Sequence, residues 1–192
     1  MIKGIVVGFV LAIVVVAGGL YYYFASGRAP AAVSDPMMPF EKKLANMALD
    51  AHIEKQHLGE SPVPADEPNL LEGARIYNMN CADCHGLPGH PSDDVNTMFP
   101  SPTQVFEGKG VTDDPPSESY WKAANGIRLS GMPAFKSKLT QTQLWQVAEL
   151  VAHANQLPDS VKKILVPDDQ DSNPEIHPES AVPKGTQARP KR

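Results

Sequence analysis

An unbroken apolar run from Gly4 to Phe24 constrains the chain more than any other feature of its sequence. As a helix with 1.5 Å of rise per residue, the run is roughly 30 Å long, which matches the hydrocarbon core of a bilayer. It is either a membrane-spanning helix or the apolar region of a secretory signal. A removable signal has an apolar region of only about 7–15 residues. We therefore expect residues 1–25 to form an uncleaved transmembrane signal-anchor.

The flanks of this run indicate its orientation. Lys3 lies just ahead of it and favours an amino terminus on the inner side, and residues 21–23 are tyrosines at the position of an aromatic belt. Arg28 follows the run, so charge alone orients the segment weakly. Ala25-Ser26-Gly27 resembles a signal cleavage site, which leaves removal of the segment as an alternative.

Prolines divide the rest of the chain into a linker, a domain and a tail. Residues 26–67 predict an extended linker, interrupted by a short amphipathic helix over residues 40–58. The positions that share its apolar face are Phe40, Leu44, Met47, Ala51 and Leu58. Residues 68–157 carry the features of a folded domain. Residues 158–192 lack a periodic apolar pattern, so we expect a disordered tail.

The only two cysteines stand three positions apart and are followed by a histidine, in Cys81-Ala82-Asp83-Cys84-His85. This is the attachment pattern of haem c, in which both thiols add to haem vinyl groups and the next imidazole binds the iron. A redox dithiol would need a thioredoxin-like context, and a zinc site would need further ligands at suitable spacing. A disulfide would close only a tiny loop. We therefore predict one covalent haem c.

Three further segments appear in the order found in one family, and over roughly residues 68–157 the chain resembles a class I c-type cytochrome. Gly73 and Tyr77 resemble its N-terminal helix, where a glycine permits close crossing by the last helix. Residues 131–135 (GMPAF) resemble the loop that supplies the sixth iron ligand, and residues 140–155 resemble the C-terminal helix. The resemblance implies an all-α, class I cytochrome c fold whose helices wrap the haem.

The helices of this domain can also be predicted from their own residues. Thr140 and Gln143 form a capping box, ahead of an apolar stripe that ends before Pro158. A short helix over residues 116–124 is entered through prolines and closed by Asn-Gly. Its Tyr120 and Trp121 are most simply core aromatics, and the resemblance implies that Trp121 lines the haem pocket.

The sixth ligand determines the chemistry. Met132 lies between a glycine and a proline that would stiffen its loop, and the resemblance implies that its thioether binds the iron opposite His85. The alternative for this methionine is to fill an irregular gap in the core. His90 and His153 are the alternatives for a bis-histidine site.

The stretch around Met98, by resemblance, runs on the His85 side of the haem. There a proline carbonyl would accept a hydrogen bond from the outer imidazole nitrogen and fix the tautomer of the ring. We favour Pro100 over Pro102 for this role.

A histidine and a methionine together leave no open position on the iron, which favours electron transfer over catalysis on a substrate. Residues 119–146 carry cations and no carboxylate, whereas residues 83–118 carry seven acids against Lys109 alone. We expect a dipolar domain that steers towards an acidic partner. The four cations are Lys122, Arg128, Lys136 and Lys138.

The anchor and the haem c motif place the domain in the periplasm, on a bacterial inner membrane crossed once. Its partners would be a quinol-oxidising complex, a terminal oxidase or a periplasmic dehydrogenase. The net charge of −5, without a basic run, argues against nucleic acid. A tethered one-electron shuttle and a fixed haem subunit of a larger oxidoreductase both fit. A five-coordinate haem that binds a gas or reduces peroxide is the enzymatic or sensory alternative.

Overall fold

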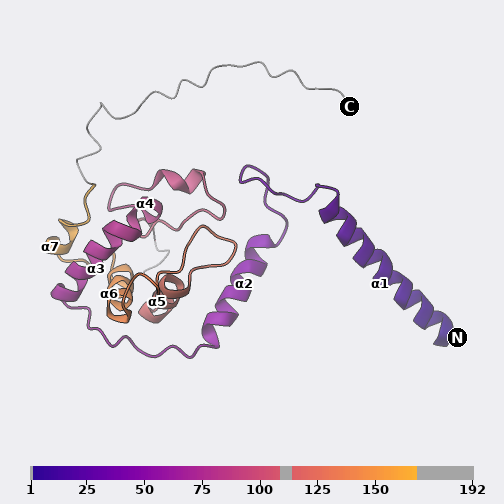
Figure 1. Ribbon diagram of the computed structural model, residues 1–192, viewed down its shortest axis with the longest axis horizontal. Helices are drawn as coiled ribbons and strands as arrows, with labels where there is room; N and C mark the ends of the chain where they lie inside the picture. Colours follow the sequence, from indigo (N-terminus) through magenta and orange to yellow (C-terminus); the bar gives the residue numbers. More distant parts are fainter. Residues whose placement is uncertain (1, 109–113, 168–192) are drawn as a thin grey trace, which may run out of the picture.

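The computed structural model describes residues 2–108 and 114–167 (Figure 1). Over these residues the regular elements are helices, and Leu87 and His90 form an isolated antiparallel β-bridge. This confirms the predicted all-α fold. The helices are α1 (Ile2–Ala25), α2 (Glu41–Glu54), α3 (Glu67–Asn80), α4 (Ala82–His85), the 3-10 helix η1 (Asp93–Asn96), α5 (Pro116–Asn125), α6 (Gln141–Ala152) and α7 (Asp159–Lys162).

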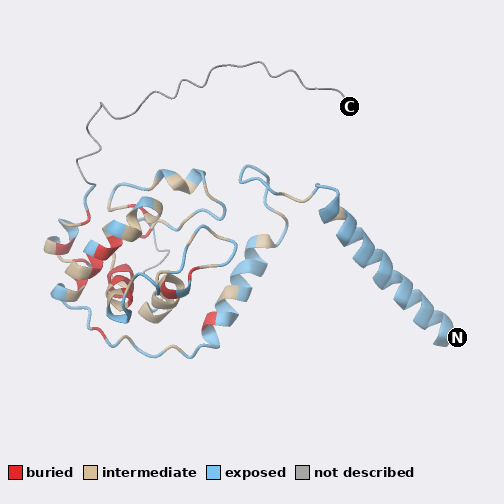
Figure 2. Ribbon diagram, in the orientation of Figure 1, coloured by how far each residue is buried: buried red, intermediate tan, exposed pale blue. Residues whose placement is uncertain are grey.

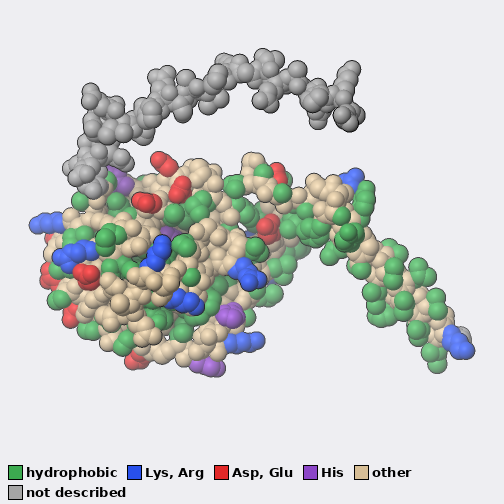
Figure 3. Space-filling view, viewed as in Figure 1, with side chains coloured by type: hydrophobic (Ala, Val, Ile, Leu, Met, Phe, Trp, Pro, Cys, Tyr) green, Lys and Arg blue, Asp and Glu red, His purple; other side chains and the backbone are tan. Residues whose placement is uncertain are grey.

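Helix α1 stands apart from the rest of the described chain and is exposed along its length (Figure 2). Its most apolar stretch of 18 residues has a mean hydropathy of 2.5, and none of that stretch is buried. Hydrophobic side chains cover α1 on the face seen in Figure 3. By length and composition, α1 can therefore cross a membrane, as expected of the N-terminal run.

Helix α2 is shorter than the amphipathic helix predicted over residues 40–58. It begins after Phe40, whose φ of 65° lies in the left-handed region, and it ends at Glu54. The following turn is tight, with His57 at a φ of 47°. The C-terminal end of α2 reaches the domain, because Ile53 is buried and the His52 ring lies 5.4 Å from that of Trp121.

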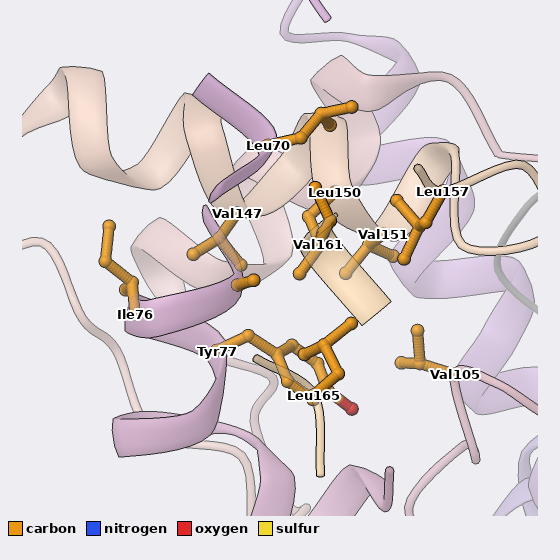
Figure 4. Close-up of a cluster of buried hydrophobic side chains, with 11 residues drawn as sticks. Leu70, Ile76, Tyr77, Val105, Val147, Leu150, Val151, Leu157, Val161 and Leu165 are labelled. Atoms are coloured by element: carbon orange, nitrogen blue, oxygen red, sulfur yellow. The ribbon is translucent and has the colours of Figure 1, made fainter. Parts of the chain in front are cut away.

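The domain core forms where α3 crosses α6 (Figure 4). At the crossing, a Cβ atom on Gly73 would lie 2.4 Å from the backbone oxygen of Gln146. Only a glycine permits this approach of the two helices. The resemblance to class I c-type cytochromes implied this role for Gly73. The buried residues of the core are Leu70, Ala74, Ile76, Tyr77, Val105, Val147, Leu150, Val151, Leu157, Val161 and Leu165.

The capping box that opens α6 is confirmed. Thr140 Oγ1 accepts a hydrogen bond from the Gln143 amide at 3.2 Å, and Gln143 Oε1 accepts one from the Thr140 amide at 2.9 Å. Each side chain thereby satisfies a backbone donor that the first turn leaves unpaired. The capping box therefore places the end of the preceding loop at Thr140.

The chain after residue 157 departs from the predicted disordered tail. Val161 and Leu165 are almost fully buried on α3, and Asn78 Nδ2 donates to the Ile164 carbonyl. Val161 lies in α7, and Leu157 and Leu165, four residues before and after it, are also buried, so this short segment adds three apolar side chains to the core. The rest of the predicted tail, residues 168–192, lies outside the described residues.

Candidate functional site

One helical turn brings the two thiols and the imidazole together. Cys81 caps α3, and its carbonyl accepts hydrogen bonds from the amides of Cys84 at 3.2 Å and His85 at 2.9 Å. Residues separated by three and four positions share a face of a helix. Cys81, Cys84 and His85 therefore project from one side of the turn, and both cysteines are free thiols.

The two thiols do not have the ionisation of a reactive dithiol. Burial, followed by the proximity of Cys84, raises the pKa of Cys81 to about 12. Burial and a hydrogen bond to Asp94 also raise the pKa of Cys84, whose Sγ lies 3.6 Å from the carboxylate. Redox-active cysteines usually have a lowered pKa. The structure therefore argues against the dithiol alternative.

The imidazole of His85 is oriented by the backbone that follows the attachment turn. His85 Nδ1 lies 2.7 Å from the carbonyl oxygen of Thr103. Because a carbonyl only accepts, Nδ1 must carry the proton, and Nε2 is the nitrogen left to bind a metal. The acceptor is thus Thr103, whereas we had favoured Pro100 over Pro102.

Two neighbouring hydrogen bonds explain why Thr103 takes this place. The Val105 amide donates to the His85 carbonyl at 3.2 Å, and Gln104 Nε2 donates to the Cys84 carbonyl at 3.1 Å. Residues 104 and 105 are therefore held against the backbone of the motif. The carbonyl immediately before them, that of Thr103, is the one presented to the imidazole.

Gln104 connects three segments around the turn. Its Nε2 also donates to the Pro102 carbonyl at 3.2 Å, and its Oε1 accepts from the Ser92 amide at 2.7 Å. Gly86, at a φ of 73°, allows this packing, because a Cβ atom there would lie 2.6 Å from Gln104 Oε1. The role of Gln104 was not anticipated from the sequence, in which an isolated glutamine gives no signal.

The Tyr77 side chain stabilises the turn that contains Cys81, Cys84 and His85. Its buried hydroxyl donates to the Gly86 carbonyl at 2.8 Å, and its ring packs edge-on against Phe106. Burial raises the pKa of Tyr77 well above its usual range, so the hydroxyl stays protonated and remains a donor. The backbone on both sides of His85 is therefore held by side-chain hydrogen bonds.

The loop that carries Met132 is fixed to the end of α5. The Ile127 amide donates to the Met132 carbonyl at 3.2 Å, and Ser130 Oγ accepts from the Met132 amide at 3.2 Å. Gly126, at a φ of 69°, lies so close that a Cβ atom would be 2.8 Å from the Met132 carbonyl. Met132 is partly buried on a tightly held backbone. Its ligation of the iron stays a prediction.

An unexpected contact joins this loop to a second methionine. The methyl carbon of Met98 would lie only 1.9 Å from a Cβ atom on Gly131. Gly131 therefore provides the space that the Met98 side chain occupies. We had expected Met98 near His85, and the structure places it against the loop of Met132.

The aromatic residues of α5 have different neighbours. Tyr120 stacks on Trp145 of α6, with ring centroids 4.1 Å apart. Trp121 is half-buried and faces His52 of α2. This contact with the linker helix was not expected, and a contact between Trp121 and haem stays a prediction.

The two histidines named as alternatives for a bis-histidine site differ in their surroundings. His90 is exposed and exchanges backbone hydrogen bonds with Leu87. His153 Nδ1 lies 2.9 Å from the Glu149 carbonyl, at the C-terminal end of α6. Within residues 2–108 and 114–167, no group of three or more His, Cys, Asp or Glu could hold a metal ion.

The cationic surface around the Met132 loop is smaller than its composition indicated. Lys122 Nζ lies 2.6 Å from Glu118 and 3.1 Å from Asp114. Burial lowers the pKa of Lys122, but hydrogen bonds to these two carboxylates outweigh it and leave the pKa raised. Lys122 therefore stays protonated, and the two carboxylates offset its positive charge. Arg128, Lys136 and Lys138 are exposed, beside a Leu129 side chain that is 92% exposed.

These residues fit a covalently bound haem c. Cys81 and Cys84 would form the thioether bonds, and His85 Nε2 would bind the iron. When bound, the haem supplies reversible one-electron chemistry. This chain contributes two protonated thiols, a His85 ring with a fixed tautomer, and a backbone held by hydrogen bonds on both sides of His85.

Comparison with known proteins agrees with this reading of the site. Residues 68–151 match the family described as cytochrome C oxidase, cbb3-type, subunit III. The match covers the attachment turn, α5 and all but one residue of each of α3 and α6. No curated protein matches the chain.

Proposed function

We propose that this monohaem class I c-type cytochrome domain passes single electrons between partner proteins while α1 holds it to a bacterial inner membrane. The observation that carries the proposal is the bond from His85 Nδ1 to the Thr103 carbonyl at 2.7 Å. This bond fixes the ring, raises its basicity and leaves Nε2 for the iron. A ring held in this way needs little rearrangement when the iron changes charge.

Met132 is proposed as the sixth ligand. Its backbone is hydrogen-bonded to Ile127, just after α5, and the capping box of α6 follows the loop, so the thioether would be presented by a backbone that moves little. A thioether favours the ferrous state and raises the potential. With both axial positions taken by protein groups, a substrate would find no free site on the iron.

The domain would face the periplasm, because covalent haem attachment takes place outside the cytoplasmic membrane. We infer that α1 runs from the cytoplasmic side outward, with Lys3 inside and the three tyrosines at the outer headgroups. The haem domain would then follow the linker on the periplasmic side. This orientation brings the domain to membrane-bound quinol-oxidising complexes, terminal oxidases or dehydrogenases.

The second candidate is a fixed haem subunit of a larger complex. The family that residues 68–151 match is described as an oxidase subunit, which favours this role. The contact of α2 with α5 also favours it, since part of the linker is then unavailable as a free tether.

Solubilisation in mild detergent separates the two. A shuttle should elute as a single haem protein, whereas a subunit should elute with stoichiometric partners that remain through ion exchange. Rapid and complete binding of carbon monoxide to the reduced protein would contradict an iron whose two axial positions are both occupied by side chains. It would favour the five-coordinate alternative. A haem protein released from membranes by carbonate would contradict the anchor.

A further inference from the structure

Helix α2 has apolar side chains on two opposite sides. Successive residues of a helix are rotated by roughly 100°, so Leu49 and Ile53 lie on one side, and Ile53 is buried against the domain. On the other side Leu44 and Met47 are each 57% exposed. We call this second side the outer face of α2, and its residues are Phe40, Leu44, Met47 and Ala51.

The outer face continues a series of exposed apolar side chains that begins after α1. Val33 is 51% exposed, Met37 is 49% exposed and Phe40 is 73% exposed. Figure 1 shows α2 between α1 and the remaining helices, and Figure 3 shows hydrophobic side chains along that edge of the domain. The exposed apolar surface therefore leads from the membrane-spanning helix to α2.

The chain between the two helices is folded into turns, which keeps α2 near the end of α1. The amides of Ala31 and Ala32 both donate to Asp35 Oδ2 at 2.8 Å, and the Met38 amide donates to Glu41 at 2.9 Å. Even fully extended, residues 26–40 could reach only about 50 Å, at roughly 3.4 Å per residue. The outer face is thus within reach of the bilayer surface.

The backbone at the start of α2 supports a function for this face. Phe40 has a φ of 65°, a conformation that bulky L residues rarely adopt, and its side chain makes no capping bond. Residues in such sparsely populated conformations cluster at functional positions. The conformation brings the Phe40 ring to the beginning of the outer face.

We propose that the outer face of α2 lies in the headgroup region of the bilayer that α1 crosses. The inference rests on the proposed anchoring by α1. Because α2 is tethered to a spanning helix, its insertion is intramolecular and needs little apolar area of its own. The charges beside the outer face are of both signs, with Lys43 and Lys55 against Asp50 and Glu54, so they do not select a strongly charged protein partner.

The proposal gives the haem domain a fixed orientation. The bilayer lies on one side of α2, and Trp121 of α5 contacts the helix near Ile53 on the other. The domain would therefore be held with α5 towards the membrane surface, and α6 and α7 farther from it. Electron partners would approach the same face of the domain at each encounter.

A spin label on the outer face tests the proposal in the full haem-loaded chain. Haem attachment consumes Cys81 and Cys84, so an introduced cysteine is the only free thiol. The labelled variants are Met47→Cys and its exposed neighbour Asn46→Cys, in nanodiscs of phosphatidylcholine with a quarter phosphatidylglycerol. Relaxation by oxygen, which enters lipid, is compared with relaxation by a water-soluble nickel chelate.

We expect the ratio of oxygen to nickel accessibility to be several-fold higher at position 47 than at position 46. Equal, water-like ratios would overturn the proposal. So would a label at position 47 that is shielded from both reagents, since this indicates a protein partner or a second copy of the chain. Elution of the haem protein apart from the discs would instead show that anchoring by α1, and hence the proposed membrane location, has failed.

Linear dichroism of the haem in oriented bilayers gives an independent measurement. The Leu44→Glu/Met47→Glu variant should lose most of the haem dichroism, while Asn46→Glu should keep it. Both altered side chains are exposed, so the domain core is unaffected. Dichroism that is the same in all three proteins would contradict the orienting role of α2.

Discussion

The crossing of α3 and α6 at Gly73 offers a quantitative test of the fold. In Gly73→Ala, the new Cβ atom would lie 2.4 Å from the Gln146 oxygen and 2.9 Å from its carbon, whereas real Cβ atoms essentially never come within 3.0 Å of a neighbour. The helices must therefore separate by more than half an ångström. Because these two atoms of Gln146 belong to the backbone, no side chain can rotate away to relieve the contact.

The expected cost follows from two opposing effects. Overpacking a core costs about 3 kcal/mol at the upper end of its usual range, and replacing glycine by alanine within a helix returns about 1 kcal/mol. The free energy of unfolding should thus fall by about 2 kcal/mol, which lowers the Tm of a domain of this size by roughly 8–16 °C.

Thermal unfolding of the full haem-loaded protein in detergent, followed by circular dichroism, measures this shift. Gly59→Ala is the matched control, because a Cβ atom there would meet nothing within 4 Å. Its Tm should stay unchanged or rise slightly. An unchanged or raised Tm in Gly73→Ala would refute the close crossing of the two helices.

Three further predictions concern the site. Tyr77→Phe removes one buried hydrogen bond and should lower the free energy of unfolding by about 1 kcal/mol. The pKa of Tyr77 is raised in the folded protein, so as the pH rises the unfolded chain loses this proton first and the wild type loses stability. Above about pH 10, the free energy of unfolding should therefore fall less in the variant than in the wild type. Gln104→Ala should weaken the bond between His85 and Thr103, lower the basicity of the imidazole and so raise the reduction potential of the haem, and an unchanged potential would contradict its positioning role. Lys136→Glu should slow electron exchange with the native partner several-fold at low salt, whereas Lys163→Glu should not; equal rates would make the cationic surface irrelevant to steering.

Local chemistry made part of this structure predictable. The capping box at Thr140 and the turn that contains Cys81, Cys84 and His85 depend on residues within four positions of one another, so spacing alone defines them. The glycine at the helix crossing was assigned through the family resemblance. These features are determined locally or recur throughout the family.

Features that depend on contacts distant in the sequence were missed or misplaced. The carbonyl facing His85 is selected by how Gln104 and Val105 pair with the motif, and a proline pattern does not encode that pairing. Helix α7 is too short to show periodicity, and it is held by burial of Val161 against α3. The contact of α2 with Trp121 likewise joins segments about seventy residues apart.

Ligation of the iron by Met132 is the claim on which electron transfer most depends. The most direct measurement is the weak near-infrared charge-transfer band of sulfur-to-iron ligation in the oxidised protein. Wild type should show it, Met132→Ala should lose it while keeping the haem attached, and the control Met79→Leu should keep it, because that side chain is 72% exposed. A band absent from the wild type, or retained in Met132→Ala, would contradict the proposed ligand and with it the closed iron.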